Sequence, residues 1–70
     1  AAELRQAELN AGRYEGTAWT AAVEEVRGVI ARAEGRTADA RRHLLAAADG
    51  FSVAGQVLDE ARCVEAAADL

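Results

Sequence analysis

The residues that could do chemistry in this sequence are few and widely spaced. His43 is the single histidine and Cys63 the single cysteine, and they stand twenty residues apart. A zinc site or general acid–base pair needs partners at set spacings, and only Asp39, four residues before His43, is close enough for a local contact. The sequence therefore predicts no metal site and no cofactor, and it predicts that His43 is exposed on the surface of a helix.

Cys63 lacks the setting that a nucleophilic thiolate requires. Its helical neighbours include Asp59 and Glu60, and negative charge raises the pKa of a thiol. We expect Cys63 to be a small, buried or half-buried apolar residue. Because no serine, phosphate-loop or carboxylate motif offers an alternative, the sequence predicts no catalytic residues and no enzyme activity.

The charged residues argue against a nucleic-acid partner. Twelve acidic residues outnumber eight arginines, for a net charge of −4, and the acids are spread along the chain. The adjacent pairs Glu24-Glu25 and Asp59-Glu60 point about 100° apart on a helix and are expected to be solvated. Arg41 and Arg42 form the one basic cluster, either as a contact for an acidic partner or as an ordinary charged face.

The composition predicts an all-α fold. The sequence has no proline and is rich in Ala, Glu, Arg and Leu, which are strong helix formers. Glycines at 12, 35 and 55 each follow an apolar-periodic segment, as helix-ending glycines do, so we expect four helices at about 2–11, 17–34, 37–54 and 56–69. Short connections would make neighbouring helices antiparallel.

Apolar stripes at helical spacing predict how these helices pack. Each expected helix after the first carries such a stripe: Trp19, Val23, Val26, Ile30 and Ala33; Ala40, Leu44, Ala47, Phe51 and Ala54; and Val57, Ala61, Val64 and Ala68. The segment 17–34 is apolar on more than one side, which predicts a middle position between two neighbours. Gly28 and Gly50 lie inside expected helices, where they either allow a close backbone approach or are simply tolerated.

The segment from Gly35 to Ala48 resembles the second helix of a tetratricopeptide-type repeat. Gly35, Ala40, Leu44 and Ala47 match its turn glycine and its small and large apolar positions, and Gly28 matches a small residue at the helix crossing. Glu24 and Ala31 stand where that family has large aromatic residues, and residues 13–69 are more similar to the longer repeats of large LuxR-type ATP-binding bacterial regulators. The resemblance implies antiparallel hairpins stacked as a short right-handed solenoid, in a segment that binds partners and belongs to a longer chain.

The sequence thus predicts a cytoplasmic, non-catalytic module for protein–protein interaction or scaffolding, as in a bacterial transcriptional regulator. The lone cysteine suits a reducing compartment, and no signal peptide or membrane span is visible. The alternative is a self-associating bundle that dimerises through the last helix. The residues expected to meet a partner are Tyr14, in the loop after Gly12, together with Arg41, Arg42, Val57, Leu58 and Val64, with Leu70 added in the dimer.

Overall fold

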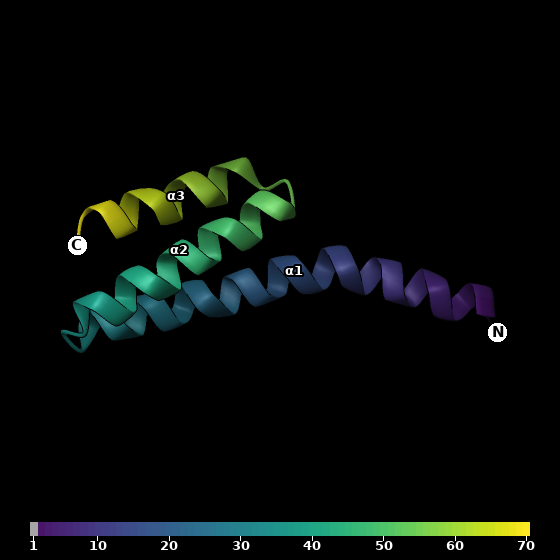
Figure 1. Cartoon of the computed structure of the whole chain (residues 1–70), viewed down its shortest axis with the longest axis horizontal. Helices are drawn as coiled ribbons and strands as arrows, with labels where there is room; N and C mark the ends of the chain where they lie inside the picture. The colour runs from purple at the N-terminus through teal and green to yellow at the C-terminus, as the bar shows by residue number, and fades with distance from the viewer. Residues whose placement is uncertain (1) are drawn as a thin grey trace.

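A computed structural model describes the backbone of residues 2–70 and the side chains of residues 17–70. Over this range the chain forms three helices and no strand: α1 (Ala2–Ala33), α2 (Thr37–Val53) and α3 (Val57–Ala68). Helix α2 packs between α1 and α3 and runs antiparallel to both, while the N-terminal half of α1 extends beyond the other two (Figure 1). The predicted all-α class and antiparallel packing are confirmed.

The predicted helix end at Gly12 is wrong. The segments expected at 2–11 and 17–34 are one continuous helix, so the described residues form three helices where four were expected. A glycine in a helix interior costs only about 1 kcal/mol, and no proline stands nearby to remove a backbone donor. Tyr14 consequently lies within α1 and not in a loop, and its side chain lies outside the described residues.

The two hairpin turns have the same geometry and confirm the predicted helix ends at Gly35 and Gly55. Both glycines have positive φ angles, +79° and +75°. In the first turn the Arg36 amide donates to the Ala31 carbonyl at 2.8 Å and the Gly35 amide to the Arg32 carbonyl at 3.1 Å. The second turn repeats this pair of bonds, so each is a Schellman cap that satisfies the carbonyls at the end of a helix.

We expect Gly35→Ala and Gly55→Ala each to destabilise the fold by about 1–2 kcal/mol, because a side chain in the left-handed region costs that much. Space is not the cause, since a Cβ at either position would meet nothing within 4 Å. Urea denaturation checks the values, with Gly35→Asn as the matched control, because asparagine tolerates this conformation better. An equal loss for the Asn and Ala variants would contradict the explanation.

The core is built mainly from small side chains. The predicted stripe of α2 is confirmed, with Ala40, Leu44, Ala47 and Phe51 buried. Helix α3 instead buries Cys63 and Ala67, so its predicted stripe was one position off. Helix α1 faces this core with Ala21 and Ala31, which are 2% and 0% exposed.

The predicted stripe of α1 lies on the wrong side for packing against α2. The contact is made by small residues because the two helices approach closely at two glycines. A Cβ built on Gly28 would lie 2.8 Å from Leu44 Cγ, and one built on Gly50 would lie 2.8 Å from Ala21 Cβ. These distances are below van der Waals contact and decide for the close-approach interpretation of both glycines. Any side chain at these two positions would overlap its neighbour on the facing helix.

Candidate interaction surface

The side of α1 that faces away from α2 is apolar and mostly exposed. We call it the outer face of α1, and it consists of Trp19, Ala22, Val23, Val26, Val29, Ile30 and Ala33. Ala22 and Val23 are half-buried, and Ala22 also packs against the core, whereas the other five are exposed. Trp19 is 72% exposed, and Val26, Val29 and Ile30 are 56%, 57% and 51% exposed. Trp19, Val23, Val26, Ile30 and Ala33 are separated by alternating steps of four and three residues, the spacing of a coiled-coil seam.

A shallow groove runs along the first half of this face. Its lining consists of Trp19, Ala22, Val23 and Val26, with Arg27 at the edge. Arg27 is paired with Glu24, whose Oε1 accepts a hydrogen bond from Nη1 at 3.1 Å. An apolar strip with one neutralised cation at its rim is suited to another apolar helix and offers little to a charged ligand.

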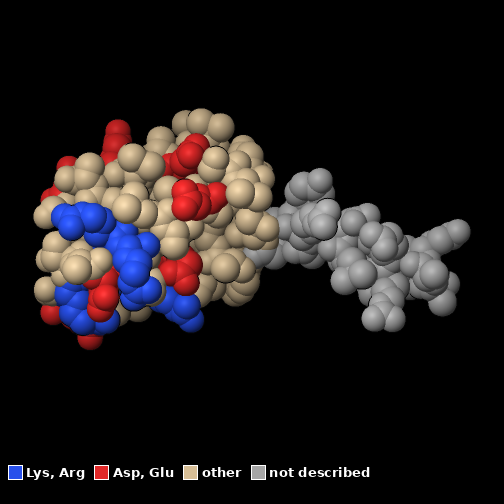
Figure 2. Space-filling model, viewed as in Figure 1, with Lys and Arg blue, Asp and Glu red and all other residues tan. Residues whose placement is uncertain are grey.

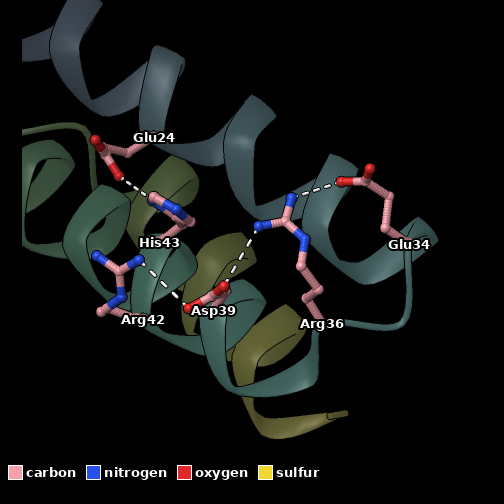
Figure 3. A network of polar contacts seen from close by, with 6 residues as sticks. All are labelled: Glu24, Glu34, Arg36, Asp39, Arg42 and His43. Carbon is pink, nitrogen blue, oxygen red and sulfur yellow. Dashed lines mark hydrogen bonds and ion pairs between the residues drawn. The ribbon is translucent and has the colours of Figure 1, made fainter.

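Glu24 lies on the side of α1 that faces α2, nearly opposite Val26, and it ties the two helices together. The Glu24 carboxylate lies 2.6 Å from His43 Nδ1 and can only accept, so Nδ1 carries the proton (Figure 3). This hydrogen bond is the largest cause that holds the pKa of Glu24 below its ordinary value, and Arg27 adds a smaller lowering. The prediction that His43 is exposed is wrong, since its side chain is only 17% exposed and its partner is Glu24. Asp39 bonds Arg36 and Arg42 instead.

Glu25 marks the border of the outer face across from Arg27, and it ties α1 to α3. Arg62 donates to both Glu25 oxygens, from Nε at 2.7 Å and from Nη2 at 2.8 Å, and its Nη1 bonds Asp59 at 2.7 Å. The guanidinium also lies 6.0 Å from the centre of the Phe51 ring. The Arg62 hydrogen bonds lower the pKa of Glu25, and they raise that of Arg62. The prediction that Glu24 and Glu25 are merely solvated is therefore wrong, because each reaches a different helix.

Cys63 is buried in the core, as predicted, and is not placed to act as a nucleophile. Burial, with the negative charge of Glu25 as the next cause, raises the pKa of the thiol to about 11. At neutral pH almost none of it is therefore thiolate.

We expect Cys63 of the folded chain to react with an aromatic disulfide reagent at least ~100-fold more slowly than in urea, because attack requires an exposed thiolate. Absorbance of the released thiolate checks this at pH 7, and an Ala61→Cys, Cys63→Ala variant with its thiol on the exposed side of α3 is the control. Equal rates for the buried and the exposed thiol would contradict the burial.

Of the residues predicted to meet a partner, those with described side chains lie on α2 and at α3 and its end. Arg41 and Arg42 are exposed on α2, and Arg42 lies 3.4 Å from Asp39. Acidic side chains intersperse the arginines on the face seen in Figure 2, so no uniform basic patch forms there. Val57, Leu58 and Val64 are exposed on α3, and Leu70 is half-buried. The outer face of α1 was missed because its large apolar residues were assigned to the core.

The described part of the chain shows neither a metal centre nor a membrane span. Among residues whose side chains are described, no group of three or more His, Cys, Asp or Glu is placed to hold a metal ion. In the same part, no helix combines the length and apolar character needed to cross a bilayer.

Comparison with protein-family models, with curated proteins and with solved structures found no match. The resemblance to a tetratricopeptide-type repeat thus remains a prediction from the residues. The function is therefore inferred from the outer face of α1 itself.

Proposed function

We propose that this chain is a non-catalytic module that binds protein helices through the outer face of α1. The observation that carries the proposal is that α1 packs inward with its small residues and exposes its large apolar ones. Its small residues pack against α2, while Trp19, Val26, Val29 and Ile30 stay more than half exposed. Large apolar side chains gathered on one exposed face are characteristic of interaction sites.

The spacing of the outer face favours a helix as the bound element. A seam with apolar residues at alternating steps of three and four accepts the side chains of a second helix as knobs into holes. Arg27 at one edge of the apolar strip, and Glu25, engaged with Arg62, at the other restrict the strip to one side of α1. A partner helix can therefore pack along α1 only on this strip.

The other end of the helix stack supports a scaffold role. Val57, Leu58 and Val64 of α3 are also exposed, so apolar side chains are uncovered on both outer helices of the three-helix layer. A unit that is apolar on two opposite sides suits an array of stacked helical hairpins. A repeat segment of a bacterial transcriptional regulator, which the sequence resemblance implies, is one setting for such a unit.

A photo-crosslinking experiment tests the proposal. We would place p-benzoylphenylalanine at position 26 on the outer face, and at the exposed position 52 of α2 as the matched control, in cells that express the chain. The expected result is a discrete protein adduct from position 26 and none from position 52. Absence of any adduct from position 26, or equal adducts from both, would overturn the proposal.

A second candidate function is homodimerisation through α3. It is favoured by Leu58, which is 85% exposed, and by Val57, Val64 and Leu70 on the same helix and its end. On this alternative, Leu58→Glu would abolish self-association while Val26→Glu would not. Sedimentation velocity on the two variants separates the α3 interface from the α1 interface.

A further inference from the structure

The outer face of α1 has an internal symmetry centred on Val26. Trp19 and Ala33 stand seven residues on either side of it, Ala22 and Ile30 four residues, and Val23 and Val29 three residues. All seven are apolar, and the two outermost pairs each join a large side chain with an alanine. In a helix these offsets keep every member within about 60° of the direction of Val26, so they form one continuous strip.

We propose that the helix bound on the outer face of α1 is α1 of a second copy of this chain, antiparallel, with the two-fold axis at Val26. The inference rests on the proposed function and names its partner. An antiparallel pair centred there places Trp19 at the level of the partner's Ala33, and Ile30 at the level of the partner's Ala22. Large side chains thus oppose small ones at both ends, and valines oppose valines in the middle, as interdigitating packing requires.

Parallel pairing of the same faces is much poorer. It would set Trp19 against the partner's Trp19 at one end and Ala33 against the partner's Ala33 at the other. The two bulky rings would separate the helices where they meet, and the paired alanines would leave a gap about 14 residues away. The volumes along the strip therefore distinguish the two orientations.

Area and charge are consistent with a reversible dimer. The four side chains that are more than half exposed present roughly 400 Å² of apolar surface per copy, about half of a standard interface contribution. The seam carries no charge of its own, and Arg27 on its rim would face the partner's Arg27. Because each Arg27 is paired with Glu24, that approach is tolerable and is eased by salt. The dimer is expected to form at micromolar to millimolar concentrations and to persist at 0.5 M NaCl.

Cysteine trapping tests the register. In a Cys63→Ala background, Val26→Cys is expected to form an interchain disulfide readily at high concentration, since facing Cβ atoms at a two-fold axis between close helices meet the geometric limits. A mixture of the Trp19→Cys and Ala33→Cys chains should give the mixed disulfide in several-fold excess over either homodimer. Leu58→Cys on α3 is the control and should cross-link at least ~5-fold more slowly than Val26→Cys.

The outcomes separate the proposals. Homodimeric disulfides of Trp19→Cys in excess over the mixed product would mean parallel pairing and overturn the register. Faster trapping at Leu58→Cys than at Val26→Cys would overturn the interface. If Val26→Cys does not trap and sedimentation shows a monomer at millimolar concentration, the second copy is excluded. A photo-adduct from position 26 with a different protein would then still support the binding function, whereas no adduct would remove both.

A charged substitution provides the independent measurement. Val26→Asp is expected to raise the dissociation constant of the dimer at least ~10-fold, because a carboxylate would lie on the two-fold axis against its own copy. The fold of each chain should persist, since Val26 points away from α2 and is 56% exposed. Circular dichroism verifies the helix content, and unchanged association of a folded Val26→Asp chain would contradict the proposal.

Discussion

Gly50→Ala is expected to destabilise the chain even though alanine is the better helix former. The added Cβ would lie 2.8 Å from Ala21 Cβ, which is fixed directly to the backbone of α1 and has no rotamer by which to move. The helices must therefore separate, and overpacking of this kind costs about 1–3 kcal/mol or more. The propensity gain of about 1 kcal/mol offsets only part of that. In a small domain each kcal/mol of net loss lowers the melting temperature by about 4–8 °C.

Urea denaturation of three variants checks this expectation. Gly28→Ala should behave similarly, because its Cβ would lie 2.8 Å from the Cγ of Leu44, which is buried and cannot turn into solvent. Ser52→Ala, at an exposed position of α2, is the matched control and should be neutral or slightly stabilising. A Gly50→Ala chain more stable than the original by the full propensity gain would show that the helices are not in close contact there.

A double-mutant cycle assigns the cost to the contact itself. Ala21→Gly removes the atom that Gly50→Ala would strike, so the double variant should recover most of the packing loss while still paying the helix-propensity cost at position 21. A coupling energy near zero would mean that the loss in Gly50→Ala arises elsewhere.

The sequence predicted the parts of the fold that depend on local chemistry. Gly35 and Gly55 end helices because the left-handed cap needs glycine, and this requirement is visible without knowing the neighbours. The α2 stripe was predictable for a similar reason, since Leu44 and Phe51 sit on the side that also carries Ala40 and Ala47. By contrast, Gly12 follows an apolar-periodic segment as a helix-ending glycine does, but it lies within α1. A single glycine does not end a helix unless another helix-breaking residue, such as proline, supports it.

The orientation of α1 was not predictable by ranking residues by hydrophobicity. That ranking places Trp19, Val26 and Ile30 inside and treats Ala21 and Gly28 as neutral. The close approach to α2 buries the small residues and leaves the large ones outside, because only small side chains fit between helices so close together. The missed signal was the pairing of Gly28 and Ala21, seven residues apart on one side of α1, opposite the large apolar residues.

The inward packing of small residues on α1 connects the fold to the proposed function. If α1 buried its large residues against α2, the chain would hide its best binding surface in its own core. By packing through alanine and glycine, the hairpin forms while Trp19 and its neighbours stay available. The cost is a thin core, so the inter-helix polar contacts at Glu24 and Glu25 become important for stability.

Acid is therefore expected to loosen the three-helix layer. The pKa values of Glu24 and Glu25 are below the ordinary value of 4.5 in the folded chain, chiefly through hydrogen bonds from His43 and Arg62. A carboxyl whose pKa is lower in the folded chain binds fewer protons there than in the unfolded chain. Its contribution to the free energy of unfolding is therefore complete above the unfolded pKa of 4.5. It is lost as the pH falls from 4.5 through the lowered folded value. The free energy of unfolding should thus fall steeply between pH 5 and 3.

Replacing the two carboxyls isolates their share of this pH dependence. Glu24→Gln with Glu25→Gln should lower stability at pH 7 and flatten the decline between pH 5 and 3, because neither amide titrates. Glu65→Gln, an exposed carboxylate on α3, is the matched control and should leave the decline unchanged. Urea midpoints at pH 7, 5, 4 and 3 measure the effect. If the free energy of unfolding of the double variant fell just as steeply, the two carboxylates would not be the source of the pH dependence. The contacts of Glu24 with His43 and of Glu25 with Arg62 would then not stabilise the helix packing as proposed.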